Sequence, residues 1–455
     1  MKYLSKAVVG KKIAISLTVG IFLQALIALA FESGGIVSGT IAKFLLDTEH
    51  VKWIFLVYGP LLAARGDIAV LAGKLGTGLH LGSIKPSFRK NTLTYKSLIA
   101  STLTIAIVDG VFIGIVTYIM NLIIYPLGIK VFNPLLFFVI PIIVLAIAAL
   151  ISSIITSAVS FFIFKKGMNP DVYVVPVMSA INNILITIIY AVVLLILKPW
   201  GGEVVVEGNI IYAVANNREL LGTYLGLIPV VLIIGGIIYV VIKFAKERDY
   251  SKMMKEASLA ILFSVILGSI TGIILSQGEE ALLAYPQLLI VFPALIGTLA
   301  DQVAITANVL ITDFSAGYIK PEIKSIKETK VWTSFLGVGS AGALITIIMC
   351  LIGTFISWNS LGAWWHVPLV IIVTVLANVL GFLFVGTLIY LLSIFAFKKE
   401  LDPDNFAIPL AACLADLSCA GLIIVFSFLI LPDIGTHETG LEIIKTLISS
   451  IIAKF

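Results

Sequence analysis

Charged residues are scarce in this sequence: Asp, Glu, Lys and Arg make up only 12% of its 455 residues. A soluble globular chain carries about 25% charged residues. Hydrophobic residues make up 60% and the mean hydropathy is +1.13, more apolar surface than a soluble fold could bury. A membrane β-barrel would show short alternating segments, whereas the apolar runs here are long and continuous. The composition excludes a soluble enzyme and a disordered chain, and predicts a polytopic α-helical membrane protein.

Cysteine and histidine are also scarce. The three cysteines, Cys350, Cys413 and Cys419, lie inside apolar segments, and the four histidines are scattered. No spacing fits a disulfide framework or a thiolate metal site, so we interpret the cysteines as small buried hydrophobic residues. The basic residues behind the net charge of +5 lie in short loops, which excludes a nucleic-acid partner. We predict no catalytic group and no resident cofactor.

Eleven apolar segments are long enough to cross a membrane, which takes about 20 residues. They lie near 13–46, 52–80, 97–125, 133–164, 172–197, 221–242, 256–276, 285–317, 331–357, 367–397 and 404–431. The first, second and eighth are too long for one straight crossing, and each contains glycine and a charged residue. We expect tilted or broken helices in these three.

The distribution of Lys and Arg predicts the orientation, because cytoplasmic loops are enriched in both. With eleven spans and a cytoplasmic N-terminus, 21 basic residues fall in inside segments and 6 in outside segments. The other three, Lys43, Arg65 and Lys74, lie within spans. We therefore predict a multi-pass cell-membrane protein whose C-terminus is extracellular.

An internal duplication is visible, because several strings recur at nearly one offset along the chain. The matching strings are Pro60 and Pro293, Asp67 and Asp301, GSIKP at 82–86 and GYIKP at 317–321, and KKGMNPDVYVVP at 165–176 and KKELDPDNFAIP at 398–409. Each copy holds five spans, and an odd number would invert the second copy unless one further crossing lies between them. The sixth span supplies it, so the copies are predicted to be parallel and related by a pseudo-two-fold axis along the membrane normal.

The duplication gives the predicted domains. A first five-helix repeat occupies 12–199, a linking transmembrane helix 221–244, and a second repeat 255–432. The chain is then a single-chain pseudo-dimer, with its pathway at or near the axis between the repeats. The last segment, 433–455, has apolar residues at helical spacing but is too short to span. We expect an amphipathic helix there, either a surface anchor or an outer lid, and a twelfth span is the third possibility.

Polar residues within spans are costly and indicate function. Asp416 follows Pro409 by seven residues, and Asn183 follows Pro176 by the same distance. The candidate ion-binding residues are Asp416, Asn183, Asp67, Asp301, Gln302 and Asn182. Carboxylate and amide oxygens without His or Cys suit a hard cation such as Mg²⁺. The structural alternative is that each aspartate pairs with Arg65 or Lys74, or caps a broken helix.

Other charged residues within spans give weaker indications of function. Glu32 is expected to cap a break in the first span. Asp109 has no partner in the second repeat, where position 342 is Gly, and a packing role and a coupling-ion role stay equally open. Asp313 is expected at the membrane interface.

The strings PLLAARGD and PDNFAIPLAACLAD resemble the MgtE-type divalent cation transporter domain, in the fused two-domain form of solute carrier family 41. The resemblance implies divalent cation transport, with the final Asp of a DPD-x4-P-x6-D segment on the ion path. Asp402 to Asp416 match that segment, whereas Asn169 to Asn183 end in an amide. The family's Gly-Asn pair appears as Gly66-Asp67 and Ala300-Asp301, so selectivity or coupling is expected to differ.

Three function classes are compatible with a polytopic membrane chain. We favour membrane transport of divalent cations, most of all Mg²⁺, as cargo. A Na⁺-coupled or other cation transporter with a diverged site is the alternative. A membrane protease using Asp67 and Asp301 is disfavoured, because the Gly-x-Gly-Asp motif it needs is absent.

Overall fold

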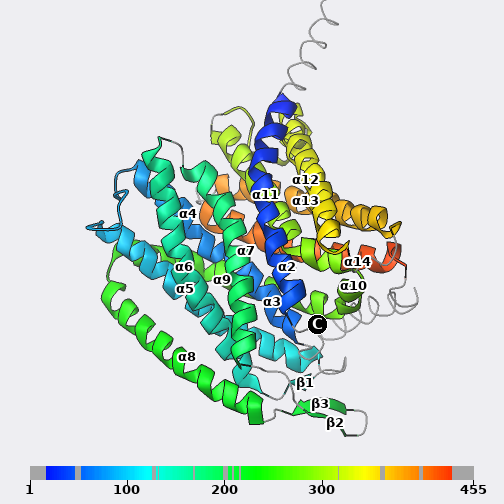
Figure 1. Ribbon diagram of the computed structural model, residues 1–455. Helices are drawn as coiled ribbons and strands as arrows, with labels where there is room; N and C mark the ends of the chain where they lie inside the picture. Colours follow the sequence, from blue (N-terminus) through cyan, green and yellow to red (C-terminus); the bar gives the residue numbers. More distant parts are fainter. Residues whose placement is uncertain are drawn as a thin grey trace, which may run out of the picture.

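The computed structural model is a bundle of long helices with a small sheet at one end (Figure 1). It describes residues 17–46, 53–124, 130–131, 133–167, 170–197, 203–207, 210–214, 217–315, 317–358, 364–398 and 403–432. The predicted amphipathic segment at 433–455 lies outside the described residues.

The first part of the bundle begins with a helix over residues 17–30. It continues through η1 (Phe31–Gly34), α2 (Gly35–Leu45), α3 (Ile54–Ala63), α4 (Arg65–His80), α5 (Leu93–Ile124), α6 (Pro134–Lys165) and α7 (Pro170–Leu197). Next comes α8 (Asn217–Phe244), whose side chains Val231 and Leu232 are largely exposed. Because an exposed apolar face suits contact with lipid, α8 is a membrane helix at the edge of the bundle.

The second part of the bundle follows α8. It comprises α9 (Arg248–Gln277), α10 (Glu279–Ala284), α11 (Pro286–Ser315), η3 (Ile323–Lys327), α12 (Thr329–Ile356), α13 (His366–Lys398) and α14 (Pro403–Ile430). Over the described residues, ten helices are long and apolar enough to cross a membrane. The predicted span that is not among these ten is the seventh, 256–276, which corresponds to the shorter apolar stretch Ile261–Gln277 of α9. The chain is a multi-pass membrane protein.

Two of the three expected helix breaks are present. The first span changes to a 3-10 turn at η1, where Glu32 lies, and the second divides at Ala64 between α3 and α4. The eighth span is not broken, because α11 continues through Pro293. In α3–α4 the Arg65 side chain binds the Leu62 carbonyl beside the break. In α11 the Thr298 hydroxyl donates to Ala294 O within an unbroken helix.

The bundle is helical as predicted, and a small sheet is added to it at one end. β2 (Glu203–Glu207) pairs antiparallel with β3 (Ile210–Val214), and β1 (Lys130–Val131) pairs parallel with β3. The strands come from the connections that follow α5 and α7. Runs of Val and Ile favour extended backbone, because branched side chains pack well on a pleated surface.

The same turn occurs twice along the chain. Gly82 and Gly317, the first residues of GSIKP and GYIKP, have φ of +69° and +71°, a left-handed conformation that glycine adopts without steric cost. The isoleucine two positions later, Ile84 or Ile319, is buried in each case. This explains why the two strings share glycine and isoleucine at those positions.

The first helix of each copy packs against the second span of the other copy. A Cβ at Gly35 or Gly39 in α2 would overlap the backbone of Ala294 or Ile290 in α11. The equivalent pair in α9, Gly268 and Gly272, stands in the same relation to the Pro60 and Leu56 backbone in α3. The two glycine pairs are separated by the same offset as Pro60 and Pro293, and small-xxx-small spacing lets helix backbones approach closely. Each second span is therefore held by a helix from the other half.

These glycine contacts predict where added volume destabilises the bundle. Gly39→Ala or Gly272→Ala should lower the free energy of unfolding by about 1–3 kcal/mol, the usual cost of overpacking. Gly235→Ala in α8 is the matched control, because nothing lies within 4 Å of its added Cβ. Thermal unfolding in detergent micelles tests this, and equal melting of all three variants would contradict it.

Candidate cation site

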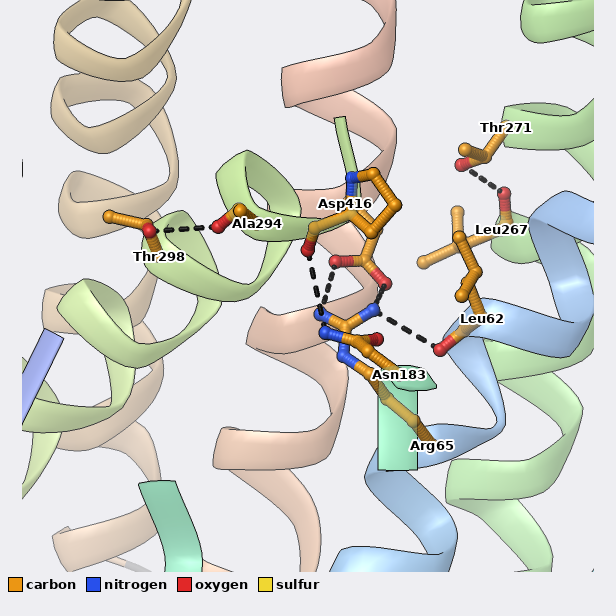
Figure 2. Close-up of polar contacts among 9 residues, drawn as sticks. Leu62, Arg65, Asn183, Leu267, Thr271, Ala294, Thr298 and Asp416 are labelled. Atoms are coloured by element: carbon orange, nitrogen blue, oxygen red, sulfur yellow. Dashed lines mark hydrogen bonds and ion pairs between the residues drawn. The ribbon is translucent and has the colours of Figure 1, made fainter. Parts of the chain in front are cut away.

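The centre of the bundle holds a buried ion pair between Arg65 at the start of α4 and Asp416 in α14 (Figure 2). Arg65 Nη2 donates to Asp416 Oδ1 at 3.0 Å, and Nη1 donates to Oδ2 at 3.2 Å. Both side chains are only 5% exposed. Such a two-point contact is among the strongest arrangements of a carboxylate and a cation. Asp416, the residue expected to be the main ion ligand, is thus paired with a cationic side chain of the same protein.

The helix break explains how Arg65 reaches this position. α3 ends at Ala63, shortly after Pro60, which provides no amide hydrogen for the helix. Arg65 Nη1 also donates to Leu62 O at 3.1 Å. The guanidinium therefore satisfies a carbonyl at the break while it binds Asp416. Arg65 pairs with Asp416 and not with Asp67 or Asp301.

Glu32 and Asp301 form a second group of buried charge beside Arg65. Glu32 is 0% exposed, and neither of its oxygens has a hydrogen-bond partner of normal geometry among the described residues. It interacts electrostatically with Asp301 and Arg65. Its carboxylate lies against Gly297 in α11, where a Cβ would overlap it. Asp301 Oδ2 is likewise buried without a partner among these residues. The buried oxygens without a partner are thus both oxygens of Glu32 and Oδ2 of Asp301, and such oxygens close together favour a bound cation.

Asn183 joins this centre, whereas Asn182 is turned to a neighbouring helix. The Asn183 amide donates to Pro293 O at 3.4 Å, and its oxygen is buried without a partner among the described residues. Asn182 Oδ1 accepts from Ser152 in α6 at 2.7 Å. Asn183 therefore has an unsatisfied oxygen next to the helix that carries Asp301, and Asn182 connects helices within the first half.

Gln302 lies away from the centre. Its oxygen accepts from Asn378 Nδ2 at 2.8 Å, and its nitrogen donates to Val338 O at 3.3 Å. These partners belong to α13 and α12. A satisfied amide between three packed helices is a structural contact, so this structure does not place Gln302 with the other candidates.

Asp67 lies with Asp109 in another buried position. Asp67 Oδ2 accepts from Ser264 in α9 at 2.8 Å. Asp109 in α5 is 0% exposed, both of its oxygens lack partners among the described residues, and it interacts electrostatically with Asp67. Neither aspartate forms an ion pair with a basic residue that the structure describes.

Three residues that were not among the candidates lie in the site. Glu32, Arg65 and Ser264 join it, although the sequence indicated structural roles for Glu32 and Arg65 and drew no attention to Ser264. The signal for Glu32 was present, since it is a charge within a span beside a glycine pair. Over the described residues no three acidic, His or Cys groups form a preformed metal cage. The arrangement instead suits a cation that keeps part of its water.

The buried ion pair makes a testable prediction about stability. Arg65→Met should lower the free energy of unfolding by about 3–5 kcal/mol, because it leaves the Asp416 carboxylate buried without a counter-charge. Arg65→Met combined with Asp416→Asn should lose clearly less than the sum of the single variants. Unfolding in detergent measures both, and additive losses would contradict the coupling.

Comparison with known proteins identifies the family. The model of the MgtE family, described as a divalent cation transporter, matches residues 59–193 and again 292–428. The curated proteins gave no match, and neither did the solved structures. The two matched regions begin at the offset of the internal repeat, contain Arg65, Asp67, Asp301 and Asp416, and together cover more than half of the chain. The chain therefore belongs to the MgtE family of divalent cation transporters.

Proposed function

We propose that this protein moves Mg²⁺ across the membrane through a carboxylate-lined pathway between its two halves. The observation that carries the proposal is the central group of Glu32, Asp301, Asp416 and Arg65. Membership of a divalent cation transporter family supports it.

The charge of this group matches one divalent cation. Three carboxylates and one guanidinium sum to a net charge of −2 when all are ionised. A buried net charge is strongly unfavourable within a membrane unless a counter-charge is present. One divalent ion would neutralise the group, whereas one monovalent ion would leave a buried charge. Oxygen ligands of this kind suit Mg²⁺, which binds through one or two carboxylates and retains waters.

Arg65 gives the pathway a resident counter-charge. In the described state it neutralises Asp416, and Glu32 and Asp301 hold unsatisfied oxygens among the described residues. An ion entering beside Glu32 and Asp301 would repel the guanidinium and weaken its contact with Asp416. Movement of Arg65 at the α3–α4 break would then expose Asp416 to the ion. The ion pair would thus close the pathway when no ion is present.

We further propose eleven spans arranged as two parallel repeats, 12–199 and 255–432, with α8 as the link. The recurring turn, the glycine contacts at one offset and the two matched regions support this. In this arrangement the central group lies on or near the pseudo-two-fold axis, because it draws residues from both halves. The N-terminus is proposed to be cytoplasmic and the C-terminus extracellular.

A Na⁺-coupled or other cation transporter is the second candidate, with Na⁺ as the coupling ion. The buried Asp67 and Asp109, which the central group does not use, favour considering a second ion. Vesicles with and without a Na⁺ gradient would distinguish coupled transport from independent Mg²⁺ flux.

Removing charge from the centre should reduce transport. Asp416→Asn and Glu32→Gln should each lower Mg²⁺ flux into vesicles at least about tenfold, equal to about 1.4 kcal/mol at the limiting step. Asp313→Asn is the matched control, since Asp313 is an acidic side chain paired with Lys330 at the end of α11. Wild-type flux in a folded Asp416→Asn protein would overturn the assignment.

The proposed orientation can be tested by labelling, because the three native cysteines are buried. Lys246→Cys, exposed between α8 and α9, should react with a membrane-impermeant maleimide only in inverted vesicles. Trp364→Cys, where the native side chain is 77% exposed, should react in intact cells. Labelling of both positions from the same side would contradict the eleven-span arrangement.

A further inference from the structure

The buried pair of Asp67 and Asp109 is not explained by packing. Asp67 comes from α4 and Asp109 from α5, and α9 packs against both helices and carries Ser264. Asp109 is fully buried and neither of its oxygens accepts a hydrogen bond from a described residue. An unsatisfied buried carboxylate is costly, and a second one beside it adds like-charge repulsion.

In the second half, the position equivalent to Asp109 is packed by uncharged groups only. Gly342 takes the place of Asp109 in the second copy, and the Gln302 side chain fills the space where a Cβ of Gly342 would lie. The Gln302 amide is satisfied by Asn378 and by Val338 O. In the first half Asp109 lies beside a second carboxylate, Asp67, and the only hydrogen bond these two accept from a described residue comes from the Ser264 hydroxyl. Because uncharged side chains fill the equivalent position in the second half, the acidic pair is not required for helix packing.

Charge and position both point to a cation. Two carboxylates without a basic partner among the described residues carry −2, the charge that one divalent ion neutralises. Carboxylate and hydroxyl oxygens are hard ligands. Cys413 in α14, three residues before Asp416, is within electrostatic reach of Asp67, Asp109 and Arg65. The pair therefore neighbours the central group.

We propose that Asp67, Asp109 and Ser264 form a second site for the transported divalent cation, between α4, α5 and α9. This inference rests on the proposed function, since it assigns the same ion to a second position. Bound water would complete its coordination, as Mg²⁺ requires about six ligands.

Two neighbouring sites would help release of the ion. A single site that neutralises a buried charge holds its ion firmly, which slows exit. An ion at Asp67 and Asp109 would repel one beside Glu32 and Asp301, as in pores where ions at adjacent sites displace one another. The second site would thus favour exit of the ion bound at the first.

Equilibrium binding of Mn²⁺ to the purified full chain in detergent tests the proposal. Free Mn²⁺ gives an electron paramagnetic resonance signal that is lost on binding, so the signal counts the bound ions, and excess Mg²⁺ should displace them. The wild type should bind two Mn²⁺ per chain. Asp109→Asn should bind one, retained at the centre, and Glu32→Gln should bind one, retained at the second site. Asp313→Asn, the control, should bind two.

The outcomes separate this inference from the proposed function. If Asp109→Asn still binds two ions, or the wild type binds one ion that only Glu32→Gln removes, the second site is overturned and the central site stands. If the wild type binds none, both fall. Asp67→Asn serves as the second variant if Asp109→Asn does not fold, and should also bind one. In the folded variant, Mn²⁺ should raise the unfolding temperature less than in the wild type.

Discussion

The buried ion pair between Arg65 and Asp416 is the contact on which the centre of this structure depends. Within a membrane a charge is tolerated only with a partner or a water-filled path. The guanidinium meets this need for Asp416 through two hydrogen bonds and also binds the Leu62 carbonyl at the helix break. The pair joins the second span of the first half to the last helix of the second half. The ion pair at the centre therefore also ties the two halves of the bundle together.

The membrane fold was largely predictable from the sequence, because the signals are long and additive. Apolar runs define spans whatever their tertiary contacts, and most of the predicted segments correspond to described helices. The breaks near Glu32 and Ala64 also followed from local chemistry, because each of these spans contains glycine and a charged residue. The sheet was missed because its strands are short and depend on pairing between two distant connections.

The candidate site was only partly predictable. The repeat drew attention to Asp67, Asp301, Asn183 and Asp416, which lie between packed helices. It could not give the partner of Arg65, because Asp416 is 351 residues away and the choice depends on how the halves pack. It also favoured Gln302, whose amide instead faces α12 and α13. The role of Glu32 was underestimated for the same reason, because it depends on how the first helix packs against α11 of the other half.

Fusion of two copies allows this centre to be asymmetric. In a homodimer an arginine after the second-span proline would occur twice, with an aspartate opposite each. Here Arg65 occurs only in the first half, and Thr298 takes the corresponding position in the second half. Asp416 of the second half binds Arg65, and Asn183 takes the position equivalent to Asp416 in the first half. A single guanidinium leaves the proposed central group at −2, whereas a second guanidinium in place of Thr298 would bring it to −1, too little to balance a divalent ion. The first helices contribute in the same unequal way: α9 supplies the Ser264 hydroxyl to Asp67, and the helix break before α2 supplies the Glu32 carboxylate to the Asp301 side. Because each second span is held by a helix from the other half, such one-sided changes alter charge without altering the packing that positions it.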